Sequence, residues 1–236
     1  MILWLASYPR SGNTFFRAVL KHVYGIPSVG IYELDRELSL MEMATRQKIE
    51  RVVDLLPENI TPLAEMVVSD RVHVVKTHEL PQEDHPAVYL VRDGRDALVS
   101  HTHYLLQYDW KLPPEERRSH FYRALRMLIE TVSFGGWSGN VLAWLARTTP
   151  TAVVKFEDLI QSPVECVEKA LSRVSYHPPQ RRADRTPTFG ELRDADPQFF
   201  RKGRVGAWRE EMPDDLHDLF WQRHAEAMER MGYRRE

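Results

Sequence analysis

The stretch Ser7–Thr14, Ser-Tyr-Pro-Arg-Ser-Gly-Asn-Thr, directly follows an apolar run at residues 1–6, Met-Ile-Leu-Trp-Leu-Ala. The run predicts a short buried strand, and the apolar residues after the Ser7–Thr14 stretch recur at helical spacing. These residues are Phe15, Phe16, Val19, Leu20 and Val23. Strand, loop and helix in this order are typical of a phosphate-binding loop.

The loop departs from the Walker A pattern, which requires a glycine, four residues and then Gly-Lys-Ser/Thr. Counting back from Gly12 places Ser7 at the first glycine position and Asn13 at the lysine position. Only Gly12 and Thr14 fit. The stretch therefore resembles a P-loop in shape rather than in chemistry.

The loop can still hold an anion. Backbone N–H groups at a helix start form an oxyanion cradle, and the Ser11 and Thr14 hydroxyls would add donors. Arg10 would supply the positive charge. The alternative is a tight turn into a helix that Ser11 or Asn13 caps.

Composition limits the class of protein. The chain has 236 residues, 43% hydrophobic and 28% charged, which predicts one soluble globular domain over residues 1–236. A net charge of −2 argues against general nucleic-acid binding. The single cysteine, Cys166, allows no intrachain disulfide, and the apolar start is too short for a signal peptide or membrane span. We therefore expect a cytoplasmic protein without a membrane partner, and nothing in the sequence indicates an oligomeric state.

Further strands and helices alternate along the chain. Apolar, β-branched runs predict strands at residues 72–75, 87–91 and 151–156. Helical spacing predicts helices from residue 96, over 115–133 and 138–147, from near 163, and over 216–231. Residues 31–56 favour another helix, whereas 177–209 lacks a period and predicts a long functional loop. This order predicts a three-layer α/β/α domain around a central parallel sheet.

Polar side chains follow the predicted strands at their carboxyl ends, where ligands bind in such sheets. Lys76-Thr77-His78 offers a cation beside a titratable base, and Arg92 closes the next strand, with Ser100 about two helical turns later. Residues 200–206, Phe-Arg-Lys-Gly-Arg-Val-Gly, form a basic cluster whose glycines let the backbone approach a phosphate.

The order of these four stretches resembles the sulfotransferases that use 3'-phosphoadenosine 5'-phosphosulfate (PAPS). Ser7–Thr14 is similar to their 5'-phosphosulfate loop, and Arg92–Ser100 to their 3'-phosphate segment. Lys76–His78 is similar to their catalytic Lys-Thr-His, and Phe200–Gly206 to the lid over the 3'-phosphate. The resemblance spans residues 5–208 and implies a P-loop NTPase-like sulfotransferase fold.

The resemblance also implies catalytic roles. His78 would be the general base that takes the proton from an acceptor hydroxyl. Lys76 and Arg10 would stabilise the charge of the transferring group, without a metal. Arg10 stands where the family has a lysine, and a guanidinium can stabilise a leaving phosphate but not protonate it. A surface ion pair for Arg10 and a solvated strand-end position for Lys76 are the alternatives.

The resemblance further implies a set of residues that bind PAPS and its product 3'-phosphoadenosine 5'-phosphate (PAP). Phe15 and Phe189 would stack on adenine, although Phe15 also fits a core position. Phe156 replaces the tyrosine that commonly contacts the adenine edge, and Trp208 would anchor the lid. The complete predicted set is Arg10, Ser11, Gly12, Asn13, Thr14, Phe15, Arg92, Ser100, Phe156, Phe189, Arg201, Lys202 and Gly203.

The acceptor is predicted only as a hydroxyl of a small molecule, glycopeptide or carbohydrate, with residues 24–70 and 101–137 forming its pocket. Two other function classes remain open. A P-loop kinase of small molecules would need the missing Walker lysine and an acidic residue for Mg²⁺. A non-catalytic nucleotide-binding domain would use the basic stretches but not His78.

Overall fold

The computed structural model describes residues 1–31, 50, 61–197 and 199–236. Its sheet is parallel throughout, with the strand order β2-β3-β1-β4-β5. The strands are β1 (Ile2–Ser7), β2 (Ser28–Gly30), β3 (His73–Thr77), β4 (Ala87–Val91) and β5 (Thr151–Lys155). Because Ala6 of β1 pairs with both Thr77 and Tyr89, the carboxyl ends of β1, β3 and β4 meet at one edge of the sheet.

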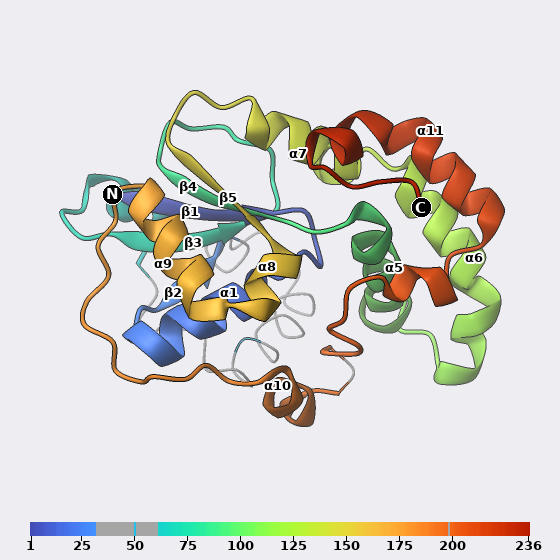
Figure 1. Cartoon of the computed structure of the whole chain (residues 1–236), viewed down its shortest axis with the longest axis horizontal. Helices are drawn as coiled ribbons and strands as arrows, with labels where there is room; N and C mark the ends of the chain where they lie inside the picture. The colour runs from blue at the N-terminus through green and yellow to red at the C-terminus, as the bar shows by residue number, and fades with distance from the viewer. Residues whose placement is uncertain (32–49, 51–60, 198) are drawn as a thin grey trace.

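Helices cover both faces of this sheet, which confirms the predicted three-layer architecture (Figure 1). One group consists of α1 (Asn13–Val19), continued by η1 (Leu20–Tyr24), α8 (Phe156–Gln161) and α9 (Pro163–Arg173). The other consists of α5 (Gly94–Tyr104), η2 (Leu105–Asp109), α6 (Pro114–Glu130), η3 (Ser133–Gly135), α7 (Gly136–Leu145) and α11 (Asp214–Arg230). The remaining helices are α4 (Leu63–Val68), α10 (Phe189–Ala195) and η4 (Ala207–Glu210).

Alternation along β1 divides the apolar side chains between two cores, because successive strand residues point to opposite faces. Leu3 and Leu5 pack with α1, α8 and α9, whereas Ile2, Trp4 and Ala6 pack with α5, α6, α7 and α11. All six residues of β1 are buried. A strand buried on both faces reads as a continuous apolar run, as residues 1–6 do.

The structure corrects the predicted elements at three places. Phe156 does not close the last strand but opens α8. The edge strand β2 was not predicted, since three residues are too few to show a period. Residues 177–209 are not one loop: they contain α10, which the Thr188–Glu191 capping box starts, and η4. The helix expected over 31–56 lies almost entirely outside the described residues.

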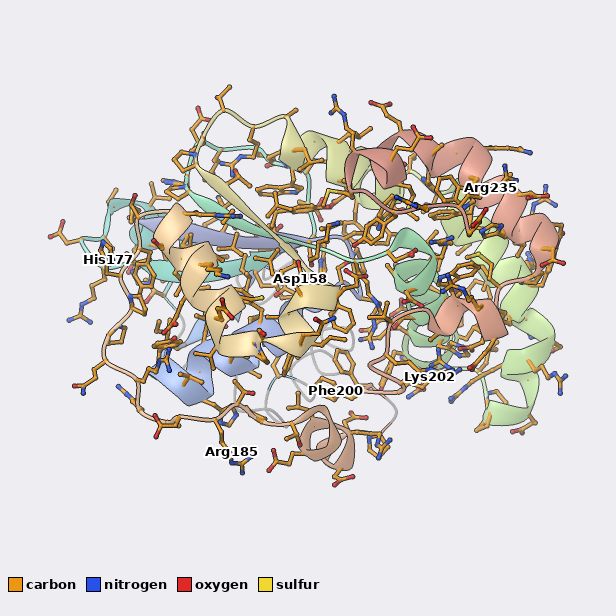
Figure 2. All side chains as sticks on the ribbon, viewed as in Figure 1. Asp158, His177, Arg185, Phe200, Lys202 and Arg235 are labelled. Atoms are coloured by element: carbon orange, nitrogen blue, oxygen red, sulfur yellow. The ribbon has the colours of Figure 1, made fainter. Side chains whose placement is uncertain are left out.

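The segment after α9 first runs along the outside of the molecule and then turns inward. Figure 2 shows His177 and Arg185 at the periphery, whereas Phe200 and Lys202 lie between the two groups of helices. Phe200 is buried and packs in the core of α1, α8 and α9. None of the helices in the described ranges is long and apolar enough to cross a membrane.

Candidate active site

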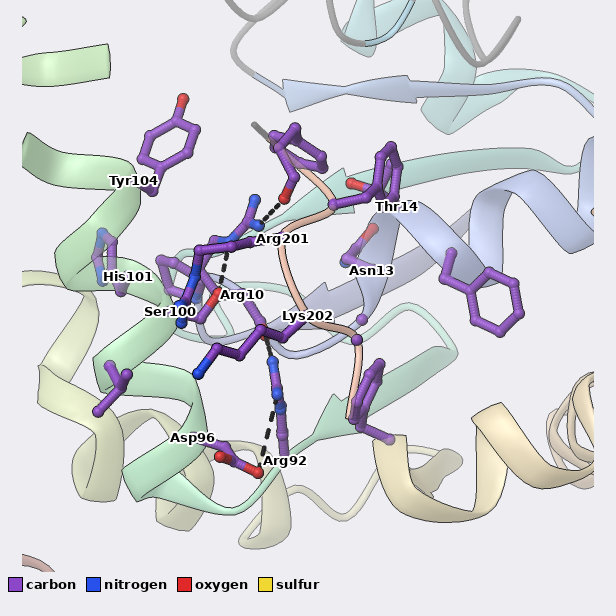
Figure 3. Close-up of a pocket in the computed structure, with 18 of the residues that line it drawn as sticks. Arg10, Asn13, Thr14, Arg92, Asp96, Ser100, His101, Tyr104, Arg201 and Lys202 are labelled. Atoms are coloured by element: carbon purple, nitrogen blue, oxygen red, sulfur yellow. Dashed lines mark hydrogen bonds and ion pairs between the residues drawn. The ribbon is translucent and has the colours of Figure 1, made fainter. Parts of the chain in front are cut away.

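A cavity of about 290 Å³ lies at the carboxyl end of the sheet and collects the predicted segments. Thirteen of the predicted site residues line it: Arg10, Gly12, Asn13, Thr14, Phe15, Lys76, His78, Arg92, Ser100, Phe156, Arg201, Lys202 and Gly203. Figure 3 shows the cationic side chains of three separate segments converging on this space. Ser11 is fully buried next to it. The side chain of Phe189 lies outside the described part of the chain, so its stacking on adenine stays a prediction.

The loop after β1 is held in a left-handed conformation at two residues. Arg10 has φ 66° and Gly12 has φ 97°. Gly12 precedes α1 without a side-chain cap, so the alternative in which Ser11 or Asn13 caps this helix is wrong. Asn13 instead donates from Nδ2 to the carbonyl oxygen of Leu5 (2.9 Å) and braces the end of β1.

Gly12 also brings the loop close to Phe156, because a Cβ at residue 12 would lie 2.6 Å from the Phe156 ring. Gly12→Ala should displace this ring and add backbone strain of about 1–2 kcal/mol. We expect a lower urea midpoint and weaker nucleotide binding by calorimetry. Gly139→Ala is the matched control, since a Cβ there meets nothing within 4 Å. Equal behaviour of the two variants would contradict the close packing at Gly12.

His78 is oriented by the neighbouring strand end. Its Nδ1 lies 2.7 Å from the carbonyl oxygen of Ser7 and 3.3 Å from the Ser7 Oγ. A carbonyl oxygen only accepts, so Nδ1 carries the proton and Nε2 carries the lone pair of the neutral ring. The β1–β3 register creates this contact, because it aligns the ends of the two strands. His78 therefore has the tautomer that a base acting through Nε2 requires.

Lys76 belongs to β3 itself rather than to the segment after it. Its Nζ lies 3.6 Å from Oε1 of Glu50, whose carboxylate also pairs with Arg17. Arg17 is anchored on Ser28 of β2 through the hydroxyl (2.8 Å). Burial acts to raise the pKa of Glu50, but the charges of Arg17 and Lys76 hold this pKa below its ordinary value. Lys76 is therefore part of a buried charge network rather than a solvated strand-end lysine.

Arg10 extends from the loop toward α5. Its Nε donates to Ser100 Oγ (3.2 Å), its Nη2 donates to the carbonyl oxygen of Phe199 (2.5 Å), and its guanidinium lies 4.1 Å from the centre of the Phe199 ring. Burial lowers its pKa to about 10, which leaves it protonated at neutral pH. Among the described side chains it makes no ion pair with a carboxylate, so the surface ion pair considered above is not formed there.

Arg92 connects the loop after β1 with the segment before η4. It donates to the carbonyl oxygens of Arg10 (3.3 Å) and Arg204 (3.2 Å), and its guanidinium lies 4.4 Å from the centre of the Phe156 ring. Asp96 pairs with it at 3.8 Å and accepts from the backbone N–H groups of residues 206 and 208 (2.7 and 2.9 Å). Burial raises the pKa of Asp96. No pattern in the sequence distinguishes Asp96 as a partner of Arg92, although it lies between Arg92 and Ser100.

The cations at residues 201–204 are paired with two carboxylates of the same chain. Arg201 makes a forked contact with the Glu211 carboxylate (2.9 and 3.1 Å), and Lys202 lies 2.9 Å from both Glu210 and Glu211. His103 adds a contact of 2.6 Å to Glu211. Burial opposes the shift, but these donors hold the pKa of Glu211 well below its ordinary value. No sequence signal connected these carboxylates with the cluster, because pairs eight to ten residues apart fit no regular period.

Trp208 anchors this cluster by packing, as predicted. It is 8% exposed, its ring stacks on His217 at 5.1 Å, and the Arg95 guanidinium lies 4.0 Å from the ring centre. His217 belongs to α11 and Arg95 to α5. The cluster is therefore attached to two helices on the other side of the cavity from α1.

Several buried polar atoms in this region have no hydrogen-bond partner among the described residues. They include Ser11 Oγ, Arg92 Nε and His101 Nδ1. Such atoms are costly to leave unpaired in a protein interior. Burial and the Arg10 charge lower the pKa of His101 to about 3, so its ring is neutral. The unpaired Ser11 Oγ and Arg92 Nε are hydrogen-bond donors near the Arg10 guanidinium, an arrangement that fits an anionic ligand with several oxygens.

Comparison with known proteins assigns the chain to a family. Residues 2–232 match the Sulfotransferase domain family, so the chain belongs to the sulfotransferase family. Sulfotransferase 1E1 of Mus musculus is 25% identical over 256 residues, covering 96% of this chain and 83% of that protein. Sulfotransferase 1A1 of Canis lupus familiaris is 23% identical over 263 residues, with 98% and 84% covered.

Solved structures show the same fold. A mouse sulfotransferase, SULT7A1, complexed with PAP superimposes with a TM-score of 0.65 at 19% identity, covering 96% of this chain and 84% of that one. Retinol dehydratase in a complex with retinol and PAP gives a TM-score of 0.61 at 18% identity, with 99% and 82% covered. The predicted P-loop-like sulfotransferase fold is thus confirmed.

Proposed function

We propose that this chain transfers a sulfuryl group from PAPS to a hydroxyl of a small-molecule, glycopeptide or carbohydrate acceptor. One observation carries the proposal: Arg10, Arg92, Arg201 and Lys202 line the same cavity as Lys76 and an imidazole whose Nδ1 is held by Ser7. Family membership and the PAP complexes of its structural neighbours support it. We also propose that residues 1–236 act as a single domain.

The residues of the loop after β1 would hold the 5'-phosphosulfate, with backbone N–H groups at the start of α1 and the Ser11 and Thr14 hydroxyls as donors. Arg92 and Ser100 would hold the 3'-phosphate, together with Arg201, Lys202 and Gly203. Phe15, Phe156 and Phe189 would contact the adenine. When bound, PAPS supplies an activated sulfuryl group, and PAP is the leaving group.

His78 would accept the proton of the acceptor hydroxyl at Nε2, while Ser7 keeps Nδ1 protonated. Lys76, fixed by Glu50, would stabilise the charge that develops on the transferring group. Arg10 would act as a permanent cation beside the leaving phosphate. The family assignment gives no support to the kinase alternative. A non-catalytic nucleotide-binding domain would use the same cationic residues, but His78 would have no catalytic role.

Small acceptors are the class that the neighbours favour. Retinol dehydratase has been solved with retinol and with androsterone, both small molecules with a hydroxyl. In this chain the lining of the cavity also includes Tyr104, Phe134 and Phe199, which would pack against an apolar acceptor. Residues 32–49 and 51–60, also proposed for the acceptor side, lie outside the described ranges.

Calorimetry with PAP tests the donor directly. We expect binding in the absence of magnesium, followed by transfer of labelled sulfate from PAPS to at least one member of a panel of hydroxylated acceptors. A requirement for ATP and Mg²⁺ would contradict the proposal. Binding of PAP without transfer to any acceptor would favour the non-catalytic alternative.

A further inference from the structure

Asn140 is a fully buried amide that neither the sequence analysis nor the proposed roles use. It lies in α7 with 0% of its surface exposed. Its Nδ2 donates to two backbone carbonyl oxygens, those of His78 and Phe134, both at 2.9 Å. Its Oδ1 accepts from the Tyr89 hydroxyl at 2.9 Å. The two amide protons thus form hydrogen bonds with two segments that are distant from each other in the sequence.

The two carbonyl groups belong to residues that line the cavity side by side. The rings of His78 and Phe134 lie edge to face, with centroids 6.0 Å apart at 67°. Phe134 has φ 56°, a left-handed conformation that costs a non-glycine residue about 1–2 kcal/mol. Such a conformation persists where the surroundings impose it. The bond from Asn140 is one of the constraints that hold it.

His78 is consequently held both at its imidazole ring and at its backbone. Ser7 fixes the ring through Nδ1, and Asn140 fixes the backbone through the carbonyl oxygen. Tyr89 is buried in β4, so its hydroxyl prevents the Asn140 amide from rotating. Trp144 donates to the carbonyl oxygen of the next residue, Glu79, at 3.1 Å but touches neither His78 nor Phe134 through a hydrogen bond.

We propose that Asn140 is a positioning residue: it holds the His78 imidazole and the Phe134 ring in one fixed arrangement, and thereby sets the rate of transfer without contributing to donor binding. The inference rests on the proposed role of His78 as the base. Reaction rates depend steeply on such placement, since a displacement of about 1 Å can cost roughly 100-fold. Asn140 lies outside the set of residues that line the cavity, so it acts only through its neighbours.

Three variants test this. Asn140→Ala should lower kcat by about 10- to 100-fold and leave the PAP dissociation constant within about 2-fold. Tyr89→Phe keeps the two hydrogen bonds that Asn140 donates but removes the one that its Oδ1 accepts, so we expect a smaller decrease in kcat. This variant replaces Asn140→Ala in the test if Asn140→Ala does not fold. Trp144→Phe is the control: it removes the hydrogen bond to the carbonyl oxygen of Glu79 but keeps an aromatic ring against Tyr89, on which Trp144 stacks at 5.7 Å, and should leave kcat within about 2-fold.

A double-variant cycle separates positioning from general damage. In a His78→Ala background Asn140→Ala should change the residual rate by less than about 2-fold, because the group it positions is absent. The same loss in both backgrounds would overturn the proposal. So would a large rise in the PAP dissociation constant.

The ring nitrogen signals of His78 give a readout that needs no catalysis. Assigned by their absence in His78→Ala, they should move or broaden in Asn140→Ala and stay in place in Trp144→Phe. Unchanged signals in Asn140→Ala would overturn the proposal even if the enzyme were active. If no acceptor is sulfated by the unaltered protein, the proposed function fails, while these signals still decide whether Asn140 positions His78.

Discussion

Replacing His78 with alanine should lower the rate of sulfuryl transfer by about 100- to 10,000-fold, the contribution typical of a general base. PAP affinity should remain within about 2-fold, because the proposed donor contacts come from other residues. The reason lies in the tautomer: with Nδ1 donating to Ser7, Nε2 is the nitrogen able to take the acceptor proton. Rates should be measured with labelled PAPS at saturating acceptor, and affinities by calorimetry.

His85→Ala is the control for this variant, since His85 is half-buried, pairs with Glu83 at 3.6 Å and lies outside the cavity. It should transfer sulfate at the rate of the unaltered protein. If His78→Ala transferred equally fast across the acceptor panel, His78 would not be the base. Loss of PAP binding in His78→Ala would instead indicate damage to the cavity.

Arg92→Ala should weaken binding of PAP by about 100-fold, or about 2.8 kcal/mol, as expected for the loss of two charge-assisted hydrogen bonds. Binding of adenosine 5'-phosphate, which lacks the 3'-phosphate, should fall by less than about 3-fold. Arg92 is 7% exposed, and its Nε has no hydrogen-bond partner among the described residues. The guanidinium therefore retains a donor for a ligand. Calorimetry with the two nucleotides gives the comparison.

Removing Arg92 also leaves Asp96 without its cation, so a second variant, Arg92→Lys, keeps a positive charge at this position but lacks the planar fork of donors. Arg147→Ala is the control. Arg147 also donates to backbone carbonyl oxygens, those of Glu83 and His85, and lies over the Trp144 ring at 5.0 Å, but it lines no part of the cavity. Equal losses for the two nucleotides would disprove the assignment of Arg92 to the 3'-phosphate.

The sequence predicted most of the sheet because strands buried on both faces leave a continuous apolar run, as in residues 2–7 and 87–91. It predicted the site because polar residues directly follow such runs. It did not reveal β2, whose three residues pair, among the described strands, with β3 alone. Nor did it reveal α10, since prolines and arginines surround a helix of only seven residues.

Partners of the site residues were harder to predict than the residues themselves. Asn140, Glu50 and Glu211 have no local sequence pattern that distinguishes them from other polar residues of the chain. Their contacts depend on tertiary structure: Asn140 donates to a carbonyl oxygen 62 residues earlier, that of His78, and Glu50 pairs with Arg17 of α1 and Lys76 of β3. The prediction for Phe156 was incomplete for the same reason, since its ring packs against Gly12 and Arg92.

The carboxylates of Glu210 and Glu211 balance the cations that the segment at residues 201–204 brings to the cavity, in keeping with a net charge of −2 for the chain. Glu210 is largely exposed and also pairs with Arg204, so the outward side of this segment presents a balanced mixture of signs to the solvent. Long polyanions such as nucleic acids meet little net attraction there. Arg10 and Arg92 line the cavity behind this segment, so under the proposed function an anion small enough to enter the cavity would be selected by access rather than by the overall charge of the protein.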